Sequence, residues 1–106
     1  MSTQSLKLGT IPVQFTLKLY NQYIFMSRGK NKNSHLLGLG LDNDDGHKRL
    51  TQADQYSILG GSEETHDKMT ESLVKTFEDL KNSGKTLEDV ETKELSALLE
   101  KNTPKS

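Results

Sequence analysis

The chain of 106 residues is predicted to fold as an α+β domain. We expect an N-terminal antiparallel sheet of three to five strands, rich in hairpins, followed by a C-terminal helical hairpin packed on one face. From Val13 to Tyr20 apolar and polar residues alternate, which is the period of a strand with one buried face. From Met69 to Leu80 the apolar residues recur at steps of four, four and three, which is the period of an amphipathic helix. Residues 1–106 are treated as one domain.

The composition predicts a small core. Apolar residues make up 31% of the chain and aromatic residues 6%, so apolar burial exceeds the entropy cost of folding by a thin margin. This favours self-association, because a second copy can cover apolar surface that one copy leaves bare. The chain has no Cys, which excludes disulfides and thiolate metal sites. No stretch has the length and apolarity of a membrane span, and a cytoplasmic location is expected.

Residues 5–59 are predicted to be mainly strands. A short edge strand is expected at Leu6–Leu8, and a hairpin at Val13–Ser27 with its tight turn at Asn21-Gln22. A two-residue loop places Tyr20 opposite Tyr23 in this hairpin. A three-residue loop would instead turn every side chain of the second strand to the other face, and the sequence leaves this register open.

The predicted hairpin has one face suited to a core and a second that is unusually aromatic. Tyr20, Tyr23 and Phe25 surround Lys18 on the second face, where a solvated surface would carry mostly polar residues. A helix, another protomer or a ligand should therefore cover it. The first face carries the aliphatic and aromatic residues Phe15, Leu17, Leu19, Ile24 and Met26.

A second set of strands is expected further along the chain. In His35–Leu41 the leucines lie on one side, while Gly38 and Gly40 lie on the other and allow another backbone to approach. Asp42–Gly46 is a turn suited to a hairpin, with a return strand at His47–Thr51. Thr51–Leu59 is ambiguous between a short helix and a strand, and the strand is favoured.

The C-terminal half is predicted to be helical. Ser62 caps a long helix over residues 62–83, and Gly84 supplies the left-handed residue that ends it. Short helices follow over residues 86–102, where Thr86 and Asp89 resemble a capping box and Thr92 caps the last helix. Residues 103–106 are expected to form a flexible tail.

The sequence indicates no catalytic residues, no metal site and no cofactor, and an enzyme is not favoured. His35, His47 and His66 lie in three different segments without the spacing of a helical zinc site. Asp42–Gly46 does not match a calcium loop, because Leu41 takes the first ligand position. Gly84-Lys85-Thr86 ends like a phosphate-binding loop but follows a helix and lacks the earlier glycine.

The aromatic face is the leading candidate for function. We interpret the chain as a small protein-interaction or regulatory module that forms a homodimer through this face. The alternative is binding of nucleic acid, because aromatic rings stack on bases and cations hold the backbone. Against this alternative, no known nucleic-acid-binding motif is present and the net charge is −1. The proposed interaction residues are Lys18, Tyr20, Tyr23, Phe25, Arg28, Lys30 and Lys32.

The start of the long helix is a second candidate, for binding an anion. Free N–H groups at a helix N-terminus attract negative charge, and here they follow two glycines. Glu63, Glu64 and Asp67 already supply negative charge to this end, so local capping is the favoured role. The residues of the candidate anion site are Gly60, Gly61, Ser62, Thr65 and His66.

Charge is unevenly distributed along the chain. Residues 1–41 hold five Lys or Arg and no acid, a net charge of +5. The remaining residues hold fifteen acids and nine bases, a net charge of −6. We interpret the two parts as complementing each other within one copy or across a dimer, although the first part could also attract an anionic partner.

Overall fold

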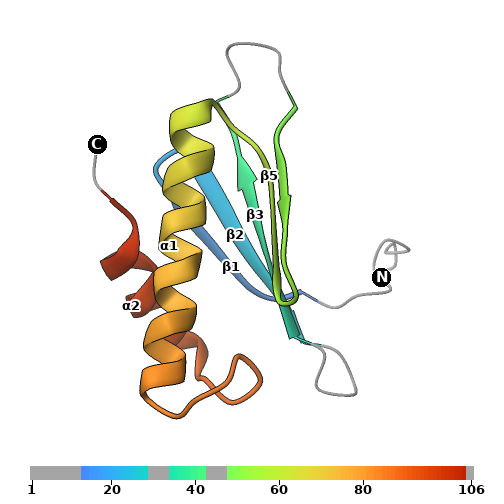
Figure 1. Cartoon of the computed structure of the whole chain (residues 1–106). Helices are drawn as coiled ribbons and strands as arrows, with labels where there is room; N and C mark the ends of the chain where they lie inside the picture. The colour runs from blue at the N-terminus through green and yellow to red at the C-terminus, as the bar shows by residue number, and fades with distance from the viewer. Residues whose placement is uncertain (1–12, 29–33, 43–47, 105–106) are drawn as a thin grey trace, which may run out of the picture.

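The protein consists of one sheet with two helices on one of its faces (Figure 1). The computed structural model describes residues 13–28, 34–42 and 48–104. The predicted α+β class is confirmed, because the strands come first and the helices last. The elements are β1 (Val13–Leu19), β2 (Gln22–Arg28), β3 (Ser34–Gly40), β4 (Leu50–Gln52), β5 (Tyr56–Gly60), α1 (Glu63–Asn82) and α2 (Thr92–Asn102).

The sheet has five strands in the order β1-β2-β3-β5-β4. All neighbouring strands are antiparallel except β3 and β5, which run parallel. The expected return strand at His47–Thr51 is wrong in position and pairing, because β4 begins at Leu50 and pairs with β5 at the sheet edge. Burial explains why β5, and not β4, lies next to β3 inside the sheet. Ile58 of β5 is fully buried, whereas β4 has no buried side chain. The strand interpretation of Thr51–Leu59 is confirmed for Tyr56–Leu59 in β5 and for Thr51 and Gln52 in β4, but residues 53–55 between them are not strand.

The first hairpin forms with a register different from the predicted one. The turn is Tyr20-Asn21, with a positive φ of 55° at Tyr20, and Leu17 lies opposite Ile24. The predicted turn at Asn21-Gln22 is wrong because Gln22 belongs to β2 and its side chain is 3% exposed. From Phe15 to Leu19 the pairing shifts by two residues in total, an even number, so these side chains and their partners on β2 keep their predicted faces. The register shifts again between Val13 and Phe15. The predicted pairing of Tyr20 with Tyr23 is wrong, because Tyr20 lies in the turn and Tyr23 pairs with Lys18.

The core lies between the sheet and the two helices. Strands β2, β3 and β5 contribute residues with no exposed surface, and both helices pack leucines against them. The apolar residues spaced along α1 therefore do form its buried stripe, as their period predicts. The fully buried core residues include Ile24, Met26, Leu36, Ile58, Met69, Leu73, Leu95 and Leu99.

The backbones of β3 and the start of α1 touch at two glycines. A Cβ added to Gly40 would lie 2.5 Å from the Gly61 Cα atom, far inside van der Waals contact. Gly38 faces α1, and a Cβ there would lie 3.4 Å from the Met69 Sδ atom. The predicted close approach of another backbone is confirmed at Gly40, whereas the atoms nearest to Gly38 belong to side chains.

The helix ends agree with the sequence for α1 but not for α2. The Ser62 side chain accepts a hydrogen bond of 3.2 Å from the Thr65 N–H, and Gly84 has a φ of +70° after the helix. At α2 the N-cap is Glu91 and makes no side-chain cap bond, so the prediction that Thr92 caps this helix is wrong. Of the short helices expected over 86–102, only α2 forms. Residues 86–90 make a turn, in which the Asp89 N–H donates to the Thr86 hydroxyl.

Some predictions fall on parts of the chain that the structure does not describe. They include the edge strand at Leu6–Leu8, the turn residues from Asn43 to Gly46, and residues 105 and 106 of the expected tail. The prediction of a flexible tail is wrong at Thr103, which is 5% exposed and whose hydroxyl donates to the Leu99 carbonyl at 2.6 Å. Across residues 13–28, 34–42 and 48–104, no helix combines the length and apolarity needed to cross a bilayer.

Candidate interaction surface on the open face of the sheet

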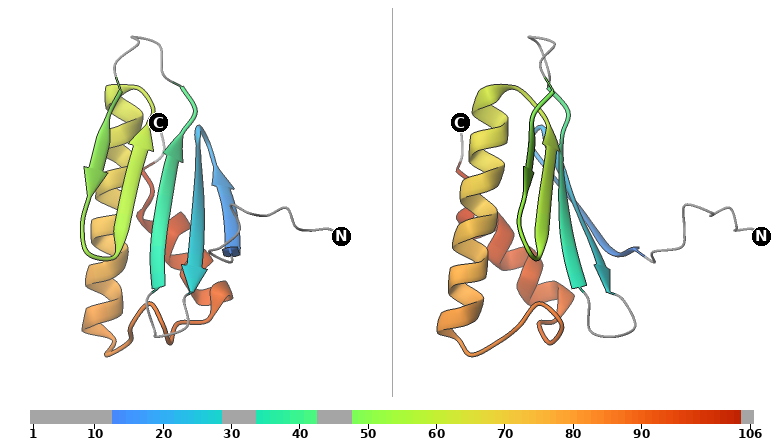
Figure 2. Two further views of the ribbon diagram at one scale, coloured as in Figure 1. Left: turned by 90° about the vertical axis from the view of Figure 1, so that its right-hand side faces the viewer. Right: turned by 45° about the vertical axis from the view of Figure 1, so that its right-hand side comes forward.

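Both helices cover the same face of the sheet, and no described segment lies over the other face (Figure 2). The side chains of this second face come from all five strands, in positions set by the strand registers. We call this surface the open face and define it by the residues Thr16, Lys18, Tyr23, Phe25, Leu37, Leu39, Leu50, Gln52, Ser57 and Leu59.

The open face contains two rows of side chains that cross the sheet. The strand pairings align Lys18, Tyr23, Leu39, Leu59 and Leu50 in the upper row. The lower row consists of Thr16, Phe25, Leu37, Ser57 and Gln52. Six of these ten side chains are aromatic or leucine, and they are adjacent across the strands. The two rows therefore form one continuous apolar patch.

Two aromatic rings and the leucines beside them form the centre of the open face. Tyr23 and Phe25 stack with ring centroids 5.7 Å apart and an interplanar angle of 25°. The leucines retain much of their surface in water, with exposed fractions of 37% at Leu37, 43% at Leu59 and 60% at Leu50. A contiguous exposed apolar patch of this kind is a mark of a protein interface.

The open face carries little charge. Of the ten residues that define the open face, Lys18 alone is a Lys, Arg, Asp or Glu. Its Nζ atom donates to the Tyr20 carbonyl at 3.0 Å. Beside the patch, the Nε2 atom of His35 and the Ser57 hydroxyl form a 3.0 Å hydrogen bond. Burial of apolar area, and not ion pairing, is therefore the main driving force that this surface offers a partner.

The structure brings together three of the seven predicted interaction residues. Lys18, Tyr23 and Phe25 share the open face, whereas Tyr20 lies in the turn at its end and is 53% exposed. Arg28 is the last residue of β2. Lys30 and Lys32 lie outside the described residues.

Four leucines of the open face were absent from the predicted site: Leu37, Leu39, Leu50 and Leu59. Alternation placed Leu37 and Leu39 on one side of a strand, but it did not show that this side joins the aromatic one. That relation needs the pairing of β2 with β3. Leu50 and Leu59 join the patch through the insertion of β5 between β3 and β4, for which the sequence holds no local signal.

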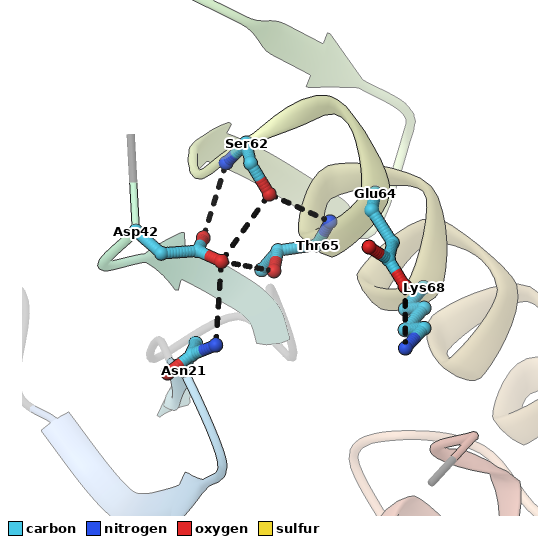
Figure 3. A network of polar contacts seen from close by, with 6 residues as sticks. All are labelled: Asn21, Asp42, Ser62, Glu64, Thr65 and Lys68. Carbon is cyan, nitrogen blue, oxygen red and sulfur yellow. Dashed lines mark hydrogen bonds and ion pairs between the residues drawn. The ribbon is translucent and has the colours of Figure 1, made fainter. Parts of the chain in front are cut away.

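Two residues of the candidate anion site, Ser62 and Thr65, meet at the carboxylate of Asp42 (Figure 3). It accepts hydrogen bonds from the Ser62 N–H at 3.1 Å, the Ser62 hydroxyl at 3.2 Å and the Thr65 hydroxyl at 2.7 Å. The Asn21 side-chain amide donates a fourth bond at 3.3 Å. A carboxylate of the chain itself therefore takes the hydrogen bonds that the candidate site would offer to a bound anion.

The environment of Asp42 favours its charged form. Burial on its own would raise the pKa of this carboxyl. The hydrogen bonds from Thr65 and Ser62 outweigh that effect, so the pKa of Asp42 lies below its ordinary value. Asp42 therefore ties the end of β3 to the start of α1 whenever it is ionised.

His66 has a structural place beside this network. Its ring is 7% exposed, and its Nδ1 atom lies 2.9 Å from the Gly60 carbonyl oxygen, which can only accept. Nδ1 therefore donates to this carbonyl, and Nε2 forms a second hydrogen bond with the Thr51 hydroxyl at 2.8 Å. The histidine connects β4, the end of β5 and α1, and both of its ring nitrogens have a partner within the chain.

In the part of the chain that the structure describes, no three His, Cys, Asp or Glu side chains are grouped so that they could hold a metal ion. Comparison of the chain with models of protein families, with curated proteins and with solved structures finds no match. The open face is therefore the feature of the molecule that suggests a function.

Proposed function

We propose that this protein is a small interaction module that forms a homodimer through the open face. One observation carries the proposal: six apolar side chains from all strands but β1 form a continuous patch on the face opposite the helices. The main core residues on the helical side have no exposed surface, and none of them belongs to the open face. The open face therefore lies outside this core and is suited to association.

The area of the open face predicts a weak or moderate dimer. Strands about 4.8 Å apart and residues spaced about 3.3 Å along them give the sheet face an area of roughly 450 Å². Two such faces bury about 900 Å² in total, which is below the roughly 1,600 Å² of a standard interface. We expect dissociation in the micromolar range, with dimers that form and separate readily.

A second copy matches the chemistry of this surface. An apolar patch is best covered by another apolar patch, and a two-fold arrangement supplies one of identical size. Lys18 lies on β1, at one border of the sheet, so packing the centres of two faces together does not require burying its charge. The low apolar content of the chain supports the same arrangement, because each copy completes the burial that the other lacks.

Binding of single-stranded nucleic acid is the second candidate. The stacked rings of Tyr23 and Phe25 beside Lys18 favour it, because exposed aromatic rings stack on bases. It predicts affinity for a single-stranded oligonucleotide that falls as salt rises. Homodimerisation is preferred, because the open face presents four leucines and a single lysine.

The substitution Phe25→Ser tests the dimer. It removes an aromatic ring from the centre of the open face, and we expect the dissociation constant of the dimer to rise about ten-fold or more. Because Phe25 lies outside the main core, the monomer should stay folded. Sedimentation velocity over a range of concentrations measures the change, and circular dichroism monitors the fold.

Val74→Ser is the matched control. Val74 lies on α1 and is 39% exposed, close to the 37% of Leu37, but it belongs to the helical side of the molecule. This variant should associate as the unmodified chain does. An unmodified chain that stays monomeric at high concentration contradicts the proposal, and so does equal weakening by both substitutions.

A further inference from the structure

We propose that the outer edge of β1 binds an extended segment of another protein, which adds to the sheet as a sixth strand beside α2. The segment has apolar residues at every second position and an acidic residue opposite Lys18. This inference concerns a surface different from the open face and does not require the homodimer.

Within the described residues, β1 pairs with another strand on one side only. It lies at the end of the strand order and is seven residues long, whereas β4 at the opposite edge has three. Leu19 and Gln22 flank the two-residue turn, so they form a hydrogen-bonded pair of the ladder. Alternation along the ladder then directs the N–H and C=O groups of Thr16 and Lys18 outward. None of the described segments pairs with these groups.

The side chains of β1 on the helical side are incompletely covered. Phe15, Leu17 and Leu19 are only partly buried, although they face the core, whereas Ile24 and Met26 on the neighbouring strand have no exposed surface. Apolar surface therefore remains open along the outer edge of β1. A further strand beside β1 would cover it.

A groove continues this open surface toward α2. It has a volume of about 800 Å³ and lies between Leu19 and Tyr20 on one side and Ala97 and Lys101 of α2 on the other. Leu98 of the same helix is also only partly buried. An edge strand next to a helix is the arrangement in which an added strand gains backbone hydrogen bonds and places alternate side chains against the helix. Figure 2 shows β1 as the outermost strand of the sheet.

The geometry of β1 determines the chemistry of the added segment. Its residues opposite Phe15, Leu17 and Leu19 face the helices and must be apolar. Its residue opposite Lys18 lies on the other side, where the lysine ammonium stands beside the edge. An acidic residue at this position forms a favourable cross-strand pair, and a basic one is repelled.

The test uses two short peptides with blocked ends, TVTVEVTV and TVTVKVTV, which differ only at the residue intended to lie opposite Lys18. Titration into the labelled chain, followed by backbone amide chemical shifts, should show saturable changes along β1 and α2. The glutamate peptide should bind about two- to five-fold more tightly than the lysine peptide. In the variant Lys18→Glu this preference should reverse.

The variant Thr16→Pro tests the backbone pairing. Proline removes an N–H group that points away from β2, a position that an edge strand tolerates, so the fold is kept. Loss of this donor and the bulk of the ring at the edge should weaken binding of the glutamate peptide about ten-fold. A glutamate peptide methylated at alternate backbone nitrogens should fail in the same way.

Three results would overturn the inference. These are no shift changes at millimolar peptide, changes confined to Tyr23 and Phe25, and, in the variant Phe25→Ser, changes at Phe15, Leu17 and Leu19 caused by raising the protein concentration without peptide. The last would show that a second copy occupies the edge. The variant Phe25→Ser should bind the glutamate peptide normally, so loss of the homodimer and loss of this site are measured separately.

Discussion

Replacing Gly40 with alanine is expected to destabilise the protein by about 3 kcal/mol or more. The new Cβ atom would lie 2.5 Å from the Cα and 2.6 Å from the N of Gly61. Both are backbone atoms, so no side-chain rotation relieves the overlap, and the end of β3 must separate from the start of α1. Chemical denaturation followed by circular dichroism measures the loss.

Gly84→Ala is the control for this substitution. Gly84 has a φ of +70°, and a Cβ atom there meets no atom within 4 Å. Alanine at this site introduces only the backbone strain of a left-handed residue, about 1 kcal/mol. If Gly40→Ala destabilises the chain no more than Gly84→Ala does, the contact between the two backbones is not as tight as the structure shows.

The substitution Asp42→Asn should destabilise the protein by about 2 kcal/mol at neutral pH. It replaces a carboxylate that accepts from Ser62, Thr65 and Asn21 with an amide that has one acceptor oxygen. It also removes negative charge from the start of α1, where the helix dipole favours it. Asp67→Asn is the control, because it removes the same charge from the first turns of α1 at an exposed position.

The pH dependence of stability separates the role of Asp42 from a general charge effect. Its pKa is lower in the folded chain than in the unfolded chain, so its contribution is complete above the unfolded value of about 3.9. That contribution is lost as the pH falls through the folded pKa. The difference in unfolding free energy between the unmodified chain and Asp42→Asn should therefore shrink below about pH 4. A difference that stays constant down to pH 2 contradicts the assignment.

The sequence predicted the elements that depend on local patterns. The alternation in β1 and the helical period of α1 each reflect a single element packed on one core, so both faces were recovered correctly. The start of α1 at Ser62 and its stop at Gly84 depend on cap geometry within a few residues. Gly40 likewise indicated from the sequence that another backbone lies close to this strand, although the sequence did not show which one.

The sequence could not predict features that depend on pairing between distant segments. Asp42 was interpreted as part of a turn, yet its carboxylate bonds to residues twenty or more positions away. The parallel pairing of β3 with β5 places Leu59 beside Leu39, and no spacing in the chain specifies that contact. The sequence therefore predicted the aromatic part of the open face. It could not predict the four leucines, because their place on this face depends on the order of the strands.

The open face and the edge of β1 offer different modes of association. The open face is an apolar surface, for which a partner with a matching apolar surface is suited. The edge of β1 offers backbone donors and acceptors with an adjacent groove, for which an extended segment is suited. Because the two surfaces share few residues, one copy can use both at the same time.

Isotope-filtered nuclear Overhauser measurements on a mixture of labelled and unlabelled chains test the homodimer most directly. They detect protons of one copy within about 5 Å of protons of another, a distance that side chains packed across an interface satisfy. The proposal predicts cross-peaks between the rings of Tyr23 and Phe25 in one copy and the methyl groups of Leu37, Leu39 and Leu59 in the other. Cross-peaks that instead involve Val74 or other residues on the helical side would contradict it.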